Sequence, residues 1–328
     1  MFDFERNCRS KVTQTLKQRF CKDTNLGIKV FEEPYFSSSV ELFDKQYGSI
    51  DKYKQFVELV DFYGSEQLYL EAYNKLKDDV INYLNDNLVM KYFSQEEDMN
   101  QFGCKNQGYP TKDIFKETFD GKVFLSIDMK KGNFTALHHY SPEIVRNKDT
   151  YEKFLGIFTD KEYFKDSKYI RQVVFGNVNP KRQVTYEKYL MDKVLTEALV
   201  SKRFSSNSVV SFSTDELVFE VEDRFKTEDG SVTEEFKSLV DLLISWALDE
   251  NINVRAEIFE LRKVPGTSGY VKKFLVGDKP YEFKCMDFLT LPFVLRAYNN
   301  EEPQEEDFVF LYEGRKAKLL EKIEIKVV

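Results

Sequence analysis

The chain has 328 residues, of which 42% are hydrophobic and 32% are charged, and its formal net charge is −8. This length suits one large domain or two to three smaller ones, and the composition is that of an ordinary globular protein. No apolar run approaches the roughly 20 residues of a membrane helix, and residues 1–20 lack the apolar core of a signal peptide. We therefore expect a cytoplasmic protein without a membrane partner. The acidic balance argues against a surface that binds phosphate throughout.

Cysteine and histidine are scarce. The four cysteines are far apart and form no CxxC pair, and the only histidines are the neighbours His138 and His139. This pattern disfavours a zinc site of Cys and His ligands and also a disulfide framework. If the chain binds a metal, we expect carboxylate ligands, which suit Mg²⁺ or Mn²⁺.

The first third of the chain has a helical pattern. Apolar residues recur at spacings of three and four over residues 39–64 and 65–87, and Ser65 is a suitable helix start. Residues 101–113 contain Gly, Pro and Asn, so we predict a loop there and place a boundary after it. The sequence thus predicts a helical region over residues 1–113.

From about position 120 the pattern is mixed. In chain order we expect a strand over 122–128, a helix over 134–140, a helix start at 141–144, helices over 150–164 and 180–203, a strand–turn–strand unit over 209–221, a helix over 233–251, and strands over 253–264 and 269–286. Asn179 as cap and Pro180 at the first helical position open the long helix. The fold class is predicted to be α+β, with a central region over 114–250 and a β-rich region over 251–328.

Three acidic residues lie at the ends of these predicted strands. The stretch SFSTDELVFEV places Asp215 and Glu216 near a tight turn, and Asp128 closes the strand KVFLSI. Carboxylates at the ends of strands in one sheet can share a divalent cation, which is how two-metal phosphoryl transfer sites are built. The alternative is structural, with Asp128 capping the next helix and the other two exposed in a turn.

The segments around these acids resemble catalytic motifs of family A DNA polymerases. DELVFEV, residues 215–221, resembles the third motif of that family, typically HDELVFEV. DMKKGNFTALHHYS, residues 128–141, resembles the first, DYSQIELRVLAHLS, and keeps its Asp, Leu, His and Ser at the same spacings. Between the two, Lys181 and Tyr189 are eight residues apart, like the Lys and Tyr of the family's helix that faces the triphosphate and the base.

The resemblance covers roughly residues 120–225 and implies a palm domain within 114–250. It implies a template- or primer-dependent nucleotidyltransferase that binds nucleic acid and nucleoside triphosphates. Asp128 and Asp215 would hold Mg²⁺ or Mn²⁺, with Glu216 assisting. The residues expected to contact the nucleotide are Lys181, Arg182, Arg171, Tyr189 and Asn133, and the N-terminal helices would form a thumb.

The chain also departs from the family. Thr214 replaces a His, and Asn133 replaces the Glu that excludes ribose, which leaves the sugar preference open. The short spacing between Asp128 and Asp215 leaves little room for fingers and suits a reverse-transcriptase-like or primase-like palm. The alternative function is a non-catalytic, degenerate palm that acts as an interaction or assembly protein. The size and the Lys/Asn/Phe/Tyr-rich usage fit a viral gene, which would place the protein in the host cytoplasm.

Overall fold

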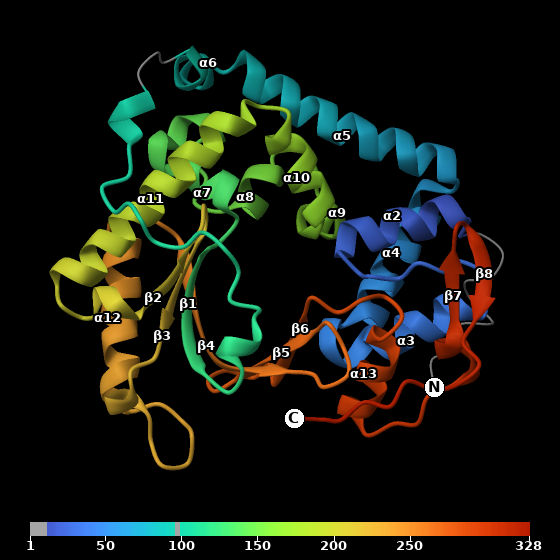
Figure 1. Ribbon diagram of the computed structural model, residues 1–328. Coiled ribbons are helices and arrows are strands. Elements are labelled where there is room, and N and C mark those ends of the chain that lie inside the picture. The colour runs from blue at the N-terminus through green and yellow to red at the C-terminus, as the bar shows by residue number, and fades with distance from the viewer. Residues whose placement is uncertain (1–11, 96–98) are drawn as a thin grey trace.

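The computed structural model describes residues 12–95 and 99–328. Residues 1–11, which belong to the predicted helical region, lie outside the described residues. The chain is α+β, as the sequence predicts: a helical N-terminal part is followed by a mixed part around an antiparallel sheet (Figure 1). Within the described ranges, no helix has both the length and the apolar character that crossing a membrane would require.

The N-terminal helices form around a cluster of aromatic side chains. Their bounds are α2 (Gln14–Thr24), α3 (Tyr35–Tyr47), α4 (Ser49–Tyr63), α5 (Glu66–Asp86) and α6 (Leu88–Gln95). The fully buried ring of Phe20 lies 5.0 Å from that of Tyr53 and 5.5 Å from that of Phe56. Ser65 caps α5 by accepting a hydrogen bond from the backbone of Leu68, as expected for its position.

The larger sheet contains six of the described strands, in the spatial order β2-β3-β1-β4-β5-β6, and every neighbouring pair is antiparallel. The strands are β1 (Val123–Met129), β2 (Val209–Phe212), β3 (Glu216–Glu220), β4 (Val254–Lys263), β5 (Tyr270–Phe274) and β6 (Tyr281–Lys284). With helices between β1 and β2 and between β3 and β4, the first four strands have the β-α-β-β-α-β connectivity of split β-α-β folds. This topology puts β1 at the centre of the sheet.

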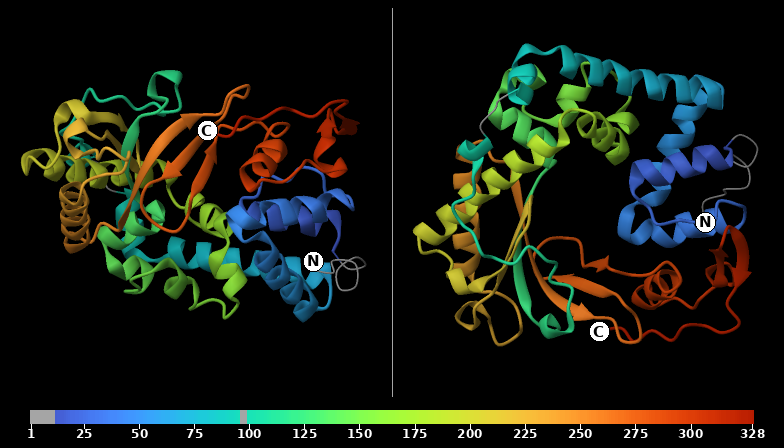
Figure 2. Two further views of the ribbon diagram at one scale, coloured as in Figure 1. Left: turned by 90° about the horizontal axis from the view of Figure 1, so that it is seen from below. Right: turned by 45° about the horizontal axis from the view of Figure 1, so that its top comes forward.

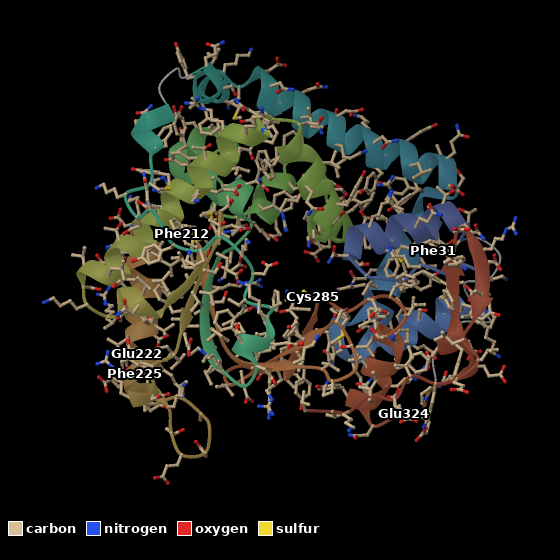
Figure 3. All side chains as sticks on the ribbon, in the orientation of Figure 1. Phe31, Phe212, Glu222, Phe225, Cys285 and Glu324 are labelled. Atoms are coloured by element: carbon tan, nitrogen blue, oxygen red, sulfur yellow. The ribbon has the colours of Figure 1, made fainter. Side chains whose placement is uncertain are left out.

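The two faces of the sheet differ. Leu125 and Ile127 of β1 point into the main core, which α11 (Pro180–Val200) and α12 (Glu234–Asp249) help to form. Phe212, labelled in Figure 3, belongs to this core, and the ammonium of Lys188 on α11 lies 5.1 Å from its ring. On the other face Phe124 lies in a smaller cluster, and Asp128, near the end of β1, is partly exposed.

The helices between β1 and α11 are short. They are α7 (Gly132–Tyr140), η3 (Pro142–Val145), α8 (Tyr151–Leu155), α9 (Glu162–Asp166) and α10 (Lys168–Gly176). The single helix predicted over 150–164 is wrong, because α8 ends at Leu155, with Gly156 as its C-cap, and a separate helix begins at Glu162. The predicted start of α11 is confirmed, since the Asn179 side chain accepts from the Arg182 backbone and Pro180 is the first helical residue.

The C-terminal part of the chain packs in two different places. Strands β4 to β6, from the predicted β-rich region, extend the same sheet that contains β1. The elements after them, α13 (Leu291–Asn299), β7 (Val309–Tyr312) and β8 (Arg315–Lys318), lie beside the N-terminal helices (Figure 2). Lys45 of α3 forms a 2.8 Å ion pair with Glu301, so segments from both ends of the chain pack together.

Candidate active site at the end of the central strands

The acidic residues predicted from sequence meet at one end of the sheet. In the register of β1 and β3, Asp128 is paired with Glu216. Just before β3, the carbonyl oxygen of Asp215 accepts a 2.8 Å hydrogen bond from the backbone of Met129. The two segments therefore meet in space, although almost ninety positions separate them along the chain.

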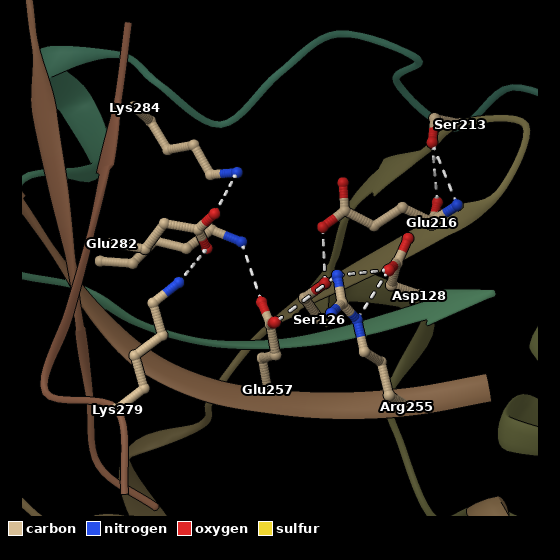
Figure 4. Close-up of polar contacts among 10 residues, drawn as sticks. Ser126, Asp128, Ser213, Glu216, Arg255, Glu257, Lys279, Glu282 and Lys284 are labelled. Carbon is tan, nitrogen blue, oxygen red and sulfur yellow. Dashed lines mark hydrogen bonds and ion pairs between the residues drawn. The ribbon is translucent and has the colours of Figure 1, made fainter. Parts of the chain in front are cut away.

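A tight turn holds Asp215 at this position. The backbone N–H of Ser213 donates to the carbonyl of Glu216 at 2.9 Å, which closes the turn between β2 and β3. On β1, the hydroxyl of Ser126 donates to the Glu216 carboxylate at 2.5 Å (Figure 4). Glu216 is thus tied to the sheet by its own hydrogen bond, whereas Asp215 is exposed at the tip of the turn.

A chain of alternating charges crosses the accessible face of the sheet. Arg255 on β4 contacts Asp128 through Nε and Nη2, each 2.8 Å from Oδ2. Its Nη2 also lies 3.7 Å from Glu257, which in turn accepts from Lys272 on β5 at 3.3 Å. On β6, Glu282 is paired with Lys284 at 3.0 Å. These contacts run from β1 to β6 (Figure 4).

The surroundings of Asp128 shift the pKa of its carboxyl group. Burial raises its pKa from 3.8 to about 6, and the neighbouring Asp215 and Glu216 act in the same direction. The attraction of Arg255 opposes this rise without overcoming it. The surroundings of Asp128 therefore disfavour its charged form even with the guanidinium of Arg255 beside it.

A cavity of about 540 Å³ opens beside these residues, within the range of ordinary ligand sites. The residues that line it are Asp128, Met129, Lys130, Lys131, Gly132, Asn133, Lys168, Arg171, Gln172, Asp215 and Arg255. They come from the ends of β1 and β3, from the start of α7, from α10 and from β4. One cavity thus combines carboxylates with several cationic side chains.

The cationic side chains are close enough to repel one another. Burial lowers the pKa of Lys131, and Arg171 lowers it further. Burial and Arg171 have the same effect on Lys168. The guanidinium of Arg171 lies 5.9 Å from the centre of the Tyr151 ring, and Lys131 is paired with Glu152. An anion bound in the cavity would relieve this repulsion.

A buried acid lies directly behind the cavity wall. Glu187 of α11 is only 6% exposed, and its carboxylate accepts a 3.0 Å hydrogen bond from the side chain of Asn133. Burial, and secondarily Asp215, raises the pKa of Glu187 from 4.5 to about 7. A Cβ at Gly132 would lie 3.3 Å from the carboxyl carbon of Glu187, so a glycine at this position leaves room for the acid.

The structure brings some of the predicted site residues together and not others. Asn133 and Arg171 line the same cavity as Asp128 and Asp215, whereas Lys181, Arg182 and Tyr189 do not line it. On an α-helix these three positions lie roughly 120° or more around the axis from Glu187, the residue of α11 that faces the site.

Each of these three side chains has another environment. Lys181 is exposed to solvent. Arg182 is buried over the rings of Phe93 and Phe102, and Tyr189 packs against Phe102 with 5.6 Å between ring centres. The eight-residue spacing of Lys181 and Tyr189 is therefore present without the predicted approach to the acidic residues.

The donor set at the cavity suits a hard cation. No group of three or more His, Cys, Asp or Glu side chains within the described ranges is arranged to hold a metal ion. Mg²⁺ is commonly bound by one or two carboxylates together with substrate phosphates, which is what Asp128 and Asp215 offer. A cation bound here would offset the repulsion that Asp215 and Glu216 exert on Asp128.

Sequence reasoning missed five contributors: Lys130, Lys131 and Lys168 in the cavity, Arg255 opposite Asp128, and Glu187 behind Asn133. Arg255 had a usable signal, because a charged residue inside a predicted strand points to a partner across the sheet. No protein-family model matches this sequence, and no curated protein or solved structure is detectably similar to it.

Proposed function

We propose that this chain is a template- or primer-dependent nucleotidyltransferase whose substrate phosphates bind in the cavity beside Asp128. The observation that carries the proposal is the composition of that cavity, in which Asp128 and Asp215 face a set of cations: Lys130, Lys131, Lys168 and Arg171. Carboxylates attract a divalent cation, and clustered Lys and Arg attract a polyphosphate. Phosphoryl transfer needs both kinds of group around one substrate.

The roles follow from the positions of the side chains. Asp128 and Asp215 would hold Mg²⁺ or Mn²⁺, which when bound supplies Lewis-acid stabilisation of phosphate charge. Arg171 and Lys168 would neutralise charge that develops on the transferred and leaving phosphates. Asn133 lines the cavity close to Asp128 and would contact the nucleotide. Glu216, held by Ser126, would add negative charge behind the cation.

The partners in this proposal are nucleic acid and nucleoside triphosphates. Additional support comes from the two segments that resemble polymerase motifs, because Asp128 on β1 and Asp215, just before β3, lie at the same end of two adjacent strands of one sheet. The sugar of the incoming nucleotide stays open in this proposal.

The test is incorporation of labelled nucleotides into primed DNA and RNA templates with Mg²⁺ or Mn²⁺. We expect incorporation by the wild type and a loss of at least about 100-fold in Asp128→Asn and in Asp215→Asn. Asp223→Asn, at an exposed position that pairs with Lys226, is the matched control and should keep the activity. No incorporation with any nucleotide, together with no change of Tm on adding either cation, would reject the proposal.

A second candidate is a non-catalytic interaction protein. The observation that favours it is the contact of Arg255 with Asp128, in which Nε and Nη2 both lie next to Oδ2. This contact supplies an internal counter-charge where a cation would bind. In that case Arg255 would stay in place, and Asp128→Asn would change stability without changing the affinity for Mg²⁺ or Mn²⁺. The cation titration therefore separates the two candidates.

A further inference from the structure

Arg255 lies between two carboxylates on the accessible face of the sheet. Its Nε and Nη2 are each 2.8 Å from Oδ2 of Asp128, and its Nη2 is 3.7 Å from Oε1 of Glu257 (Figure 4). One short movement of the guanidinium would exchange the first partner for the second. The two carboxylates thus give the guanidinium of Arg255 two alternative positions.

The freedom to move is uneven among these residues. The side chain of Asp128 is 23% exposed and that of Glu257 is 18% exposed, whereas that of Arg255 is 54% exposed. Asp128 belongs to the central strand, and Glu257 is also held by the buried Lys272. The long side chain of Arg255 is therefore the member that can change its position without disturbing the sheet.

We infer that Arg255 is a displaceable counter-charge: it neutralises Asp128 in the free protein, and a divalent cation binding at Asp128 moves it onto Glu257. This inference rests on the cation site of the proposed function and adds a positioning residue to it. In its contact with Asp128, Arg255 also lines the cavity of the proposed function.

Glu257 is the part of the arrangement that makes displacement favourable. A guanidinium that leaves Asp128 without a new partner would lose an ion pair, and the cation would have to compensate for that loss. Glu257 is already at 3.7 Å, so the new contact needs only a small rotation. Removing Glu257 should therefore weaken cation binding only while Arg255 is present.

The test is a titration of Tm with Mn²⁺ or Mg²⁺, without nucleotide, for the wild type, Arg255→Gln, Glu257→Gln and the double variant. The midpoint is the apparent dissociation constant of the cation, obtained from the rise of Tm with cation concentration. We expect Arg255→Gln to lower the midpoint concentration about fivefold, as for an ion pair of ordinary strength. Glu257→Gln should raise the midpoint in the wild-type background and leave it unchanged in the Arg255→Gln background. Arg262→Gln, on the same strand and paired with Glu260, should titrate like the wild type.

The inference would be overturned if Arg255→Gln and Glu257→Gln changed the midpoint independently, so that their effects added up in the double variant. Charges that act only at a distance give additive effects, whereas residues that exchange a shared partner do not. An unchanged midpoint in Arg255→Gln would also overturn it. If Arg255→Gln does not fold, Arg255→Lys, which keeps the charge but not the two-pronged contact, should have an intermediate midpoint, and a wild-type midpoint would count against the inference.

The outcomes separate this inference from the proposed function. The expected midpoints together with no nucleotide transfer would overturn the function and support the inference. Nucleotide transfer together with additive effects of Arg255→Gln and Glu257→Gln on the midpoint would support the function and overturn the inference. No response to either cation in any of the chains would overturn both.

Discussion

The side-chain amide of Asn133 donates a hydrogen bond to the buried carboxylate of Glu187, with 3.0 Å between Nδ2 and Oε1. This contact joins the first turn of α7 to the middle of α11, directly behind the wall of the cavity. Because Oε1 of Glu187 accepts this bond, the Asn133 amide lies with its nitrogen toward Glu187. A residue outside the cavity thus controls a side chain that lines it.

The first prediction concerns the pH dependence of stability at Glu187. Its pKa is raised from 4.5 to about 7, so the folded protein binds this proton more tightly than the unfolded chain does. The stabilisation is therefore complete below about pH 4.5 and is lost as the pH rises toward 7. We expect Glu187→Gln to remove this dependence and to exceed the wild type in stability above pH 7 by about 1–3 kcal/mol.

Urea unfolding of both proteins between pH 5 and pH 8 measures the effect, and the difference between the two curves isolates Glu187 from Asp128, whose pKa is also raised. Parallel curves for wild type and Glu187→Gln would show that the buried carboxyl group ionises as it does in the unfolded chain.

The second prediction compares two cations for phosphate binding. Arg171 lines the cavity, whereas Lys181, at the start of α11, does not. We expect Arg171→Gln to weaken binding of a nucleoside triphosphate about tenfold or more, because it removes a charge-assisted hydrogen bond, while Lys181→Gln changes it less than twofold. Calorimetric titration with the triphosphate gives both affinities. The reverse order would favour the position that the sequence resemblance assigns to Lys181.

The third prediction concerns the loop over residues 103–113. The buried carboxylate of Asp192 accepts backbone hydrogen bonds from Lys105 at 2.8 Å and Asn106 at 2.9 Å, which fastens the loop to α11. Asp192→Ala leaves these donors without their acceptor, and we expect it to lower the free energy of unfolding by about 2–4 kcal/mol. Asp192→Asn keeps one acceptor and should lose less. Urea unfolding measures both, and limited proteolysis should first cleave this loop in the alanine variant.

The fourth prediction concerns the contact between the N-terminal helices and the helices around α10. Asp23 of α2 is 2% exposed and accepts hydrogen bonds from Tyr73 at 2.6 Å and from Ser167 at 2.7 Å. We expect Asp23→Ala to cost about 3 kcal/mol or more, because the buried hydroxyl groups of Tyr73, Tyr163 and Ser167 lose their common acceptor. Asp78→Ala, at an exposed position on α5, is the control and should stay within about 0.5 kcal/mol of the wild type. Thermal unfolding of the three proteins measures the difference.

Local patterns in the chain were enough to place most of the elements. Asn179 and Pro180 mark the start of α11, and the strand–turn–strand around Asp215 is where an apolar run broken by two acidic residues predicts it. Such signals act over a few residues and need no information from the rest of the molecule. The single helix expected over 150–164 is wrong for a local reason as well, since α8 ends at Leu155 and Gly156 is its C-cap.

By itself, the sequence determined the class of fold and the two strand ends at which acidic residues stand, because periodicity, caps and turns depend on neighbouring residues. Only the tertiary structure decided what surrounds those acids. The register of β1 with β4 sets Arg255 against Asp128, and the packing of α11 turns Glu187 rather than Tyr189 toward the site. Strand register and the rotation of a helix follow from the whole core, in which contacts between distant segments determine which side chains share a cavity.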